Sequence, residues 1–281
     1  MAETSVAEKT GEHDILAPKH VQKTYDKVAS TYDALWTKHV SEPSERLTTD
    51  LRRKRGDRLA DLACGTGHYT LDMARLSAPG EVVGVDYSKN MLAGAKERFA
   101  DANFPVTLVH AKAEEFIDSA AAESFDAVSM RFVLAYLDWA NVLPRIGRIV
   151  RPGGRVAILT SLSNALPQLW KVWDQLTGGA LPMTAPVPDT NEQIAALLAK
   201  GGLGTVYGSW EYQIRLWFDD GMQAMAWMKE SGYGTHPALQ FMTPEAVQQL
   251  MQVVAKGLED EFRTAQGVPL EFTASGILVR K

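Results

Sequence analysis

Residues 58–67 read RLADLACGTG, an apolar run that ends in two closely spaced glycines. A short apolar run bounded by glycine is typical of a buried strand. Gly65 and Gly67 have no Cβ, so the backbone there can turn tightly and approach a ligand closely. The next segment, HYTLDMARL at residues 68–76, has the apolar spacing of an amphipathic helix. The stretch therefore predicts a strand, a glycine-rich turn and a helix whose first N–H groups can bind a polar ligand.

Strands and helices continue to alternate on the C-terminal side of this turn. Further strands are predicted at residues 81–86, 105–111, 125–131, 155–160, 208–218 and 270–280, with the first at 58–64. Helices are predicted at 21–36, 44–53 with Ser44 as the cap, 68–76, 88–100 with a capping serine, 191–202, 219–232 and 243–263. Residues 148–154 are interpreted as a helix end that runs into a turn. This alternation predicts an α/β fold, a parallel sheet covered by helices on both faces.

The composition of the 281-residue chain is ordinary for a globular protein, and its net charge of −5 argues against binding nucleic acid through phosphates. Its single cysteine, Cys64, excludes a disulfide within the chain, and we interpret it as loop packing because no base is evidently paired with it. No apolar run is long enough to span a membrane, and residues 1–14 lack a signal-peptide pattern. We expect a cytoplasmic protein without nucleic-acid or membrane partners.

Acidic residues follow the first two strands at the edge where open parallel sheets bind ligands. Asp86 ends the second strand 19 residues after Gly67, the position from which an acid can accept hydrogen bonds from a ribose. Asp61 is placed to receive an ammonium group. A dinucleotide fingerprint would require a third glycine at position 70, where this chain has Thr70. The sequence therefore disfavours an NAD-dependent oxidoreductase, which stays as one alternative. A non-catalytic or repurposed nucleoside-binding protein is a second alternative.

Several segments resemble class I S-adenosylmethionine-dependent methyltransferases. DLACGTGHYT (61–70) is similar to their first motif and GVDYSKNML (84–92) to their second, while FDAVSMRFVLAYL (125–137) and RIVRPGGRVAIL (148–159) resemble the fourth strand and the turn before the fifth. YDKVASTYDALW (25–36) resembles the ubiquinone and menaquinone biosynthesis C-methyltransferases. FDDGMQAMAWMKESG (218–232) and VPLEFTASGILVRK (268–281) resemble the lid helix and last strand of malonyl carrier-protein and trans-aconitate methyltransferases.

This resemblance implies a Rossmann-like, doubly wound sheet of seven strands, mostly parallel with the last antiparallel, plus inserted lid helices. It implies a flexible tail at 1–20 and one methyltransferase domain at 21–281. Within that domain, residues 21–57 would form cap helices, and 161–205 and 219–266 would form acceptor-pocket or lid segments. The expected function is methyl transfer to an oxygen or carbon of a small, largely apolar metabolite. The chain is also compatible with a homodimer.

The implied cofactor is S-adenosyl-L-methionine, and no metal is expected. Its predicted ligands come from five segments: Tyr25 and Tyr32; Asp61, Ala63, Gly65, Thr66 and Gly67; Asp86, Tyr87 and Met91; Lys112, Ala113 and Glu114; and Arg131. Tyr87 and Met91 are expected beside the adenine. Lys112 stands where such enzymes often have an acid, so the adenine amine is assigned either to the backbone of Ala113 or to Glu114.

The catalytic and acceptor residues are predicted from side-chain type. Tyr25 and Tyr32 are seven residues apart, which places both phenols on one helical face beside the cationic sulfur. His236 is the preferred base, with His39, His68 and His110 as weaker candidates. The acceptor pocket is assigned to Tyr136, Trp139, Trp170 and Trp173. A second aromatic and methionine group is interpreted mainly as core: Trp210, Tyr212, Trp217, Phe218, Met222, Met225, Trp227 and Met228.

Overall fold

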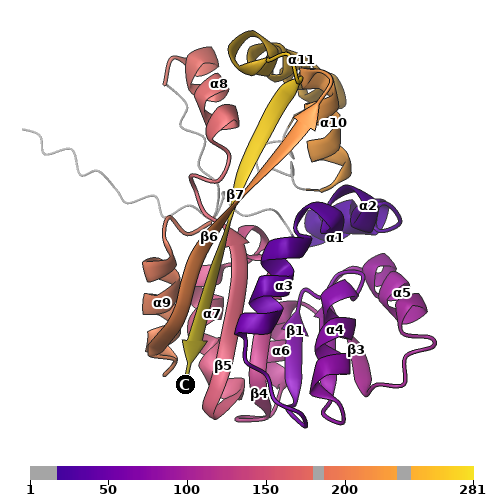
Figure 1. Cartoon of the computed structure of the whole chain (residues 1–281), viewed down its shortest axis with the longest axis vertical. Coiled ribbons are helices and arrows are strands. Elements are labelled where there is room, and N and C mark those ends of the chain that lie inside the picture. The colour runs from indigo at the N-terminus through magenta and orange to yellow at the C-terminus, as the bar shows by residue number, and fades with distance from the viewer. Residues whose placement is uncertain (1–17, 180–186, 233–241) are drawn as a thin grey trace, which may run out of the picture.

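The computed structural model describes residues 18–179, 187–232 and 242–281, and within them seven strands form one sheet (Figure 1). The strand order is β3-β2-β1-β4-β5-β7-β6. Strands β1 to β5 are parallel, whereas β7 runs antiparallel to both β5 and β6. The predicted seven-strand Rossmann-like sheet is confirmed. The strands are β1 (Leu59–Leu62), β2 (Val82–Asp86), β3 (Val106–His110), β4 (Phe125–Arg131), β5 (Val150–Ser161), β6 (Thr205–Phe218) and β7 (Val268–Arg280).

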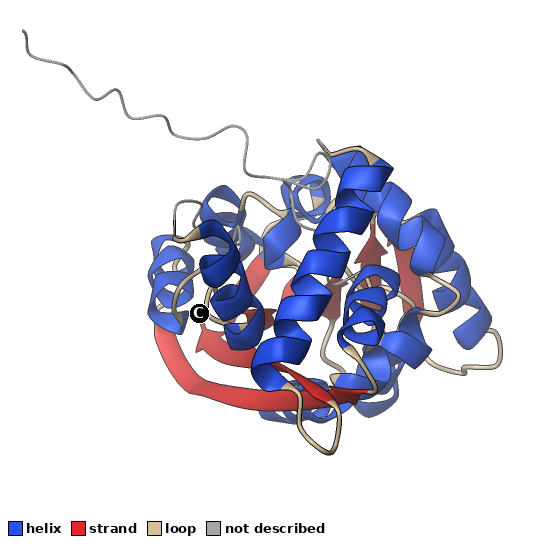
Figure 2. Ribbon diagram, turned by 90° about the horizontal axis from the view of Figure 1, so that it is seen from above, coloured by secondary structure: helices blue, strands red, loops and turns tan. Residues whose placement is uncertain are grey.

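Helices flank the sheet, as the view from above shows (Figure 2). Buried side chains of α3 (Ser41–Asp50) and α4 (His68–Ser77) pack on one face of the strands. Those of α6 (Ala113–Ser119), α7 (Trp139–Ile149) and α9 (Asn191–Lys200) pack on the other face. Helix α5 (Lys89–Arg98) lies against β2 and β3, and its predicted serine cap is confirmed, because Ser88 Oγ accepts a 3.1 Å hydrogen bond from Met91 N.

The single helix predicted at residues 21–36 is wrong. The segment forms α1 (Pro18–Val28), α2 (Tyr32–Leu35) and the 3₁₀ turn η1 (Thr37–His39), so the last three residues of the predicted tail are helical. The break lies at Thr31, whose N–H and hydroxyl both donate to the Val28 carbonyl, at 3.0 and 3.2 Å. Serine and threonine side chains compete in this way with regular helical hydrogen bonds. The remainder of the predicted tail lies outside the described residues.

Two further boundaries differ from prediction. Helix α3 begins at Ser41, so Ser44 is a buried residue inside the helix rather than its cap. Strand β5 begins at Val150 rather than at Arg155, because an irregularity in the ladder lets Val150 pair with Phe125 before regular pairing resumes. Residues 148 and 149 end a helix as predicted, whereas residues 150–154, predicted as a turn, are part of the strand.

The lid helices stand at the far ends of the two long strands β6 and β7 (Figure 1). These helices are α8 (Pro167–Thr177), α10 (Gly221–Glu230) and α11 (Pro244–Phe262). Helix α9, assigned by sequence to the acceptor-pocket segment 161–205, instead buries Ile194 and Leu198 in the core behind the sheet. Most of the second aromatic group belongs to the core on the lid side, as predicted, whereas Met222 is 41% exposed.

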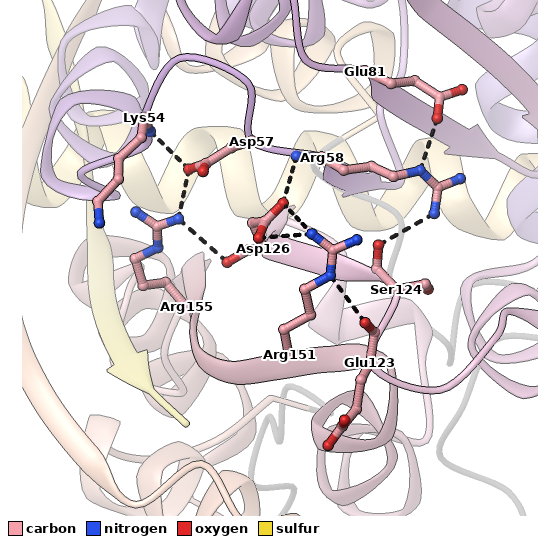
Figure 3. A network of polar contacts seen from close by, with 9 residues as sticks. All are labelled: Lys54, Asp57, Arg58, Glu81, Glu123, Ser124, Asp126, Arg151 and Arg155. Carbon is pink, nitrogen blue, oxygen red and sulfur yellow. Dashed lines mark hydrogen bonds and ion pairs between the residues drawn. The ribbon is translucent and has the colours of Figure 1, made fainter.

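A polar network joins the amino ends of β1, β2, β4 and β5, on the opposite side of the sheet from the strand ends that bind ligands (Figure 3). Its buried centre is the ion pair between Arg155 Nη2 and Asp57 Oδ2, at 2.6 Å. Asp126 accepts hydrogen bonds from both Arg58 N and Arg151. Arg58 in turn pairs with the partly exposed Glu81 at 2.8 Å. The network fixes the starts of the strands whose far ends build the site.

Candidate active site

The glycine-rich turn after β1 is held in place by the acid that ends β2. Asp86 Oδ2 accepts a 2.8 Å hydrogen bond from Gly65 N, and its Oδ1 accepts one of 2.8 Å from Ser88 N. Burial raises the pKa of Asp86 to about 6, against the lowering effect of these two hydrogen bonds. Gly67 has φ +74°, and a Cβ there would lie 2.6 Å from Phe99 Cζ, so both the backbone and the space require glycine.

Thr70, which replaces the third glycine of the dinucleotide pattern, packs closely against β2. The room for it comes from Gly84, where a Cβ would lie 3.3 Å from Thr70 Cγ2 and 3.2 Å from Cys64 Sγ. The Thr70 hydroxyl donates a 2.6 Å hydrogen bond to Asp61 Oδ2. Close helix–strand packing, which the third glycine would allow in a dinucleotide site, is thus provided by a glycine on the strand. Thr70 uses its hydroxyl to orient Asp61.

A cavity of about 790 Å³, counted with its open mouth, lies above the carboxyl ends of β1, β2 and β4. Eleven of the fourteen predicted cofactor residues line this first cavity, and ten of them are Tyr25, Tyr32, Ala63, Gly65, Asp86, Tyr87, Met91, Lys112, Ala113 and Glu114. Arg131 lines it as well, as does Tyr136 of the predicted acceptor pocket. The sequence analysis missed eight lining residues: Val21, Gln22, Val85, Ser88, Ala111, Phe132, Val133 and Leu137.

Three tyrosines from separate elements meet in this cavity. The ring of Tyr25 lies edge-on to those of Tyr32 and Tyr136, at 6.0 and 5.5 Å between ring centroids. Tyr32 stands over the glycine turn, 4.0 Å from the position that a Cβ on Gly65 would take. Burial raises the pKa of all three phenols. They therefore remain protonated at neutral pH and can act there as hydrogen-bond donors rather than as bases.

The end of the cavity near β3 is built from Tyr87, Lys112 and Glu114. The Lys112 ammonium lies 5.5 Å from the centre of the Tyr87 ring and pairs with Glu115 at 3.5 Å. Glu114 Oε2 is buried and has no hydrogen-bond partner among the described residues. A buried carboxylate oxygen without a donor is costly, which indicates that a ligand donor completes it. Glu114 thus presents a buried, unpaired carboxylate oxygen two residues from Lys112.

A second cavity of about 440 Å³ adjoins the first and shares Tyr32, Ala63, Gly65, Arg131 and Phe132 with it. It contains the predicted residues Asp61 and Thr66. Asp61 Oδ1 pairs with Arg131 Nη1 at 3.2 Å, and the two side chains are only 4% and 8% exposed. Burial raises the pKa of Asp61 and lowers that of Arg131, in each case against the effect of the partner charge. One carboxylate oxygen of Asp61 is thus already paired with Arg131.

The cap helices close over both cavities through two aspartates that sequence reasoning missed. Asp26 Oδ1 accepts hydrogen bonds from Ser88 Oγ at 2.6 Å and from Asn90 N at 3.2 Å. Asp33 Oδ1 accepts from Thr66 Oγ1 at 2.7 Å, and Asp33 also pairs with Arg98. A signal was present in the sequence, since the dipeptide Tyr-Asp occurs at 25–26 and again at 32–33. Tyr25 and Tyr32 face the cavities, and Asp26 and Asp33 hold the cap helices against the rest of the site.

Other predicted residues do not meet at these cavities. Neither cavity is lined by Trp139, Trp170 or Trp173, and the Trp170 Nε1–H donates to the Ser163 carbonyl at 2.7 Å. His236, the preferred base, lies outside the described residues. Gly67 is part of the glycine-rich turn but lines neither of the two cavities.

The remaining histidines and the cysteine were minor candidates. His110 Nε2 lies 3.0 Å from the Tyr87 carbonyl, a structural contact, and His39 packs against Trp227. His68 lines the second cavity. Burial raises the pKa of the Cys64 thiol well above its ordinary value, which agrees with a packing role for it. In the described ranges, no group of three or more His, Cys, Asp or Glu side chains could hold a metal ion.

Residues 59–154 match the family model of a methyltransferase domain. The match begins at β1 and ends within β5, so it contains the glycine turn, Asp86 and Arg131. The fold and this match show a methyltransferase domain on a Rossmann-like sheet over residues 59–154, which confirms the predicted resemblance. No helix in the described part of the chain is both long and apolar enough to cross a membrane.

Individual relatives agree with this class. The demethylmenaquinone methyltransferase of Staphylococcus aureus (strain JH9) is 32% identical over 157 residues, 53% of this chain and 60% of the relative. The chain thus spans less than two thirds of the curated relatives it matches. The YcgJ protein of Bacillus subtilis superposes with a TM-score of 0.60 at 17% identity, over 86% of this chain and 98% of that one.

Two further solved structures share the fold. The [4+2]-cyclase SpnF superposes with a TM-score of 0.62 at 16% identity, over 95% of this chain and 97% of that one. A phosphoethanolamine N-methyltransferase of Haemonchus contortus, solved with S-adenosylhomocysteine, gives a TM-score of 0.57 at 18% identity, over 95% of this chain and 60% of that one. Together with the matched domain, these neighbours support S-adenosylmethionine as the cofactor.

Proposed function

We propose that this protein is a methyltransferase that uses S-adenosyl-L-methionine to methylate an oxygen or carbon of a small, largely apolar metabolite. The observation that carries the proposal is Asp86, an acid in the cavity wall whose carboxylate is fixed by the N–H of the glycine turn. An acid at the end of the second strand, beside a tight glycine turn, is suited to hold a ribose.

The residues present fit this cofactor. Asp86 would accept hydrogen bonds from the ribose hydroxyls, and Tyr87 and Met91 would lie beside the adenine. Glu114 would accept a hydrogen bond from the adenine amine, since its buried Oε2 lacks a donor among the described residues. The N–H and carbonyl groups around Ala63 and Gly65 border both cavities and leave room for a ligand that extends from one cavity into the other.

When bound, the cofactor supplies an electrophilic methyl group on a sulfonium. The protein then has to align the acceptor with the S–CH₃ bond and exclude water, which can supply roughly 7–11 kcal/mol of the barrier. Tyr25, Tyr32 and Tyr136 would donate hydrogen bonds to an acceptor oxygen and present their ring faces to the positive charge. Because their pKa values are raised, we assign them to positioning and not to proton abstraction.

The acceptor is proposed to be apolar because the lining beside the tyrosines is mainly aromatic and aliphatic, with Phe132, Val133 and Leu137. The name of the Staphylococcus aureus relative, demethylmenaquinone methyltransferase, supports an apolar acceptor for a similar domain. His236 remains a proposed base for an acceptor that must lose a proton. We propose that the protein works in the cytoplasm, and a homodimer stays open to measurement.

The test is calorimetric titration of the full chain with S-adenosylmethionine, S-adenosylhomocysteine and NAD, repeated with Asp86→Asn. We expect both adenosyl compounds to bind to the native protein and to bind at least tenfold more weakly to the variant, about 1.4 kcal/mol. Asp126→Asn, in the network at the opposite edge of the sheet, is the matched control and should leave binding unchanged. Binding of NAD alone would contradict the proposal.

Binding alone leaves the reaction to be shown. Incubation with methyl-labelled S-adenosylmethionine and a panel of phenolic, enolic and quinol acceptors measures label transfer and S-adenosylhomocysteine release. Tight binding of the cofactor without release across the panel would favour a protein that uses the site for another purpose.

A further inference from the structure

Strand β6 is an open edge of the sheet. It stands last in the strand order, so only one of its sides is paired, and that side meets β7. Among the described residues, no other segment makes a backbone hydrogen bond to residues 206–217. An exposed edge strand offers a row of N–H and C=O groups to a further strand, and proteins commonly keep such strands short or place lysine or proline in them. β6 has 14 residues and contains neither.

The two faces of β6 differ in what they contact. Its exposed side chains alternate along the strand and therefore share one face: Ser209, Glu211, Gln213 and Arg215. The opposite face packs within this chain, since Ile214 and Leu216 are buried and the Tyr212 hydroxyl donates to Glu42 of α3. Residues that lie opposite each other in an antiparallel pair share a face, so a second β6 strand must align its polar positions with these polar positions.

The regular part of β6 has a defined centre. Its pairing with β7 is uninterrupted from Gly208 to Phe218, after a register shift between Val206 and Gly208. Gln213 is the middle residue of this run. When two copies of the run pair antiparallel over their whole length, a two-fold axis passes between the two Gln213 residues. Each Glu211 then lies directly opposite Arg215 of the second copy.

These two charges make the edge complementary to itself. Glu211 has no ion-pair partner in the described part of the chain. Arg215 pairs with Glu271 of β7, yet its side chain is 59% exposed, so the outer side of the guanidinium is open to a second carboxylate. Opposite charges at facing positions stabilise an antiparallel pair, and like charges destabilise it. A uniformly acidic or basic partner would be repelled by one of the two residues, whereas a second copy is attracted by both.

We infer that β6 is the interface of a symmetric dimer, in which two copies of the chain pair their β6 strands antiparallel around Gln213. The sheet of one copy continues into the sheet of the other, and two Glu211–Arg215 pairs fix the register. The inference concerns association and not catalysis, so it stands independently of the proposed function.

The experiment is sedimentation velocity of the full chain over a range of concentrations. We expect the native protein to sediment as a dimer. Glu211→Arg and Arg215→Glu each turn both attractive pairs into repulsive ones, so each should weaken self-association about tenfold or more. An equal mixture of the two variants has opposite charges at every facing position and should dimerise again. Such recovery requires both variants to be folded and depends on the register around Gln213.

The matched controls are Glu97→Arg and Lys96→Glu, which change the net charge by the same amounts at exposed positions of α5, against β2 and β3. Both should stay dimeric. Hydrogen exchange gives a second measurement, because the amides of residues 208–218 that point away from β7 should be protected in the dimer and lose that protection on dilution.

Three sedimentation results would each overturn the inference: a native protein that stays monomeric, a dimer that neither reversal weakens, or variants that fail to associate on mixing. Protection of the same amides in a monomer would mean that the edge is covered from within the chain, which contradicts it as well.

Discussion

The hydroxyl of Thr66, in the glycine-rich turn, donates a 2.7 Å hydrogen bond to Asp33 on the short helix that covers it. Arg98 completes the triangle, because its Nε donates to the Thr66 carbonyl at 3.0 Å while its guanidinium pairs with Asp33. The glycine-rich turn, the cap helix α2 and helix α5 are therefore joined at one point beside the cavities. We expect ligand exchange to require this point to open, since residues of the cap helices line both cavities.

Asp33→Ala is expected to speed cofactor dissociation, because the turn and the cap lose their common acceptor. Loss of hydrogen bonds to a charged group, about 1.5–3 kcal/mol, corresponds to an increase in the off-rate of roughly tenfold or more. Stopped-flow displacement of a fluorescent S-adenosylhomocysteine derivative measures this rate. Asp72→Ala removes the exposed pair with Arg75 and should leave the rate unchanged. An unaltered off-rate in Asp33→Ala would show that the cap opens elsewhere.

Cofactor affinity is expected to rise with pH between 5 and 7. Burial raises the pKa of Asp86 from 3.8 to about 6, so the native carboxyl is protonated below that value and accepts ribose hydrogen bonds fully only above it. The same shift means that Asp86 costs stability as pH rises from 3.8 to about 6, because the native state holds the proton longer. Calorimetric titrations at several pH values give the profile. Asp86→Asn should flatten it, and a native profile in that variant would assign the effect to another group.

Gly67→Ala is expected to destabilise the fold more than Gly153→Ala. Both glycines have φ +74°, so both substitutions carry a similar backbone cost, about 1–2 kcal/mol. A Cβ on Gly67 would lie 2.6 Å from Phe99 Cζ, whereas nothing lies within 4 Å of one on Gly153. Overpacking adds about 1–3 kcal/mol at Gly67 alone. Urea denaturation of the two variants measures the difference, and equal midpoints would contradict the steric argument.

Asp57→Asn is expected to lower the free energy of unfolding by about 3–5 kcal/mol, because it leaves the buried Arg155 without its carboxylate. Glu81→Gln, which breaks the half-exposed pair with Arg58 in the same network, should cost about 1 kcal/mol or less. Guanidinium denaturation distinguishes the two. Neither variant should change cofactor affinity, since the network lies at the opposite edge of the sheet, and a similar cost for both would mean that burial does not decide the outcome.

The sheet and the floor of the site could be predicted from sequence because their signals are local. Apolar runs, the glycine turn, the Ser88 cap and Asp86 each lie within a few residues of the element that they define. The contacts that hold the predicted cap helices in place could not be predicted, since Asp33 meets Thr66 and Arg98 across 33 and 65 positions of the chain. The spacing of apolar residues also could not show that the helix breaks at Thr31, because that spacing carries no information on competing hydrogen bonds.

The assignment of the acceptor pocket stays a prediction for a related reason. Trp170 and Trp173 are spaced three apart, which places them on neighbouring positions of a helix but does not show what the helix covers. In the structure Trp170 directs its N–H to Ser163 and packs against the lid-side core. The sequence does not distinguish a large side chain of an inserted helix that packs in the core from one that contacts a ligand.

Strands β5 and β7 are hydrogen-bonded neighbours, yet the lid helices lie between them in the chain. Ser161, at the end of β5, is in register with Ala274 of β7, so the segment between them, which includes the edge strand β6, returns beside its own starting point. A segment with adjoining ends can be exchanged as a cassette without moving the strands that receive it. Residues 162–273, which carry the edge strand β6 and the start of β7 as well as the lid helices, are therefore a natural unit for grafting between relatives, while the matched region 59–154 is left intact.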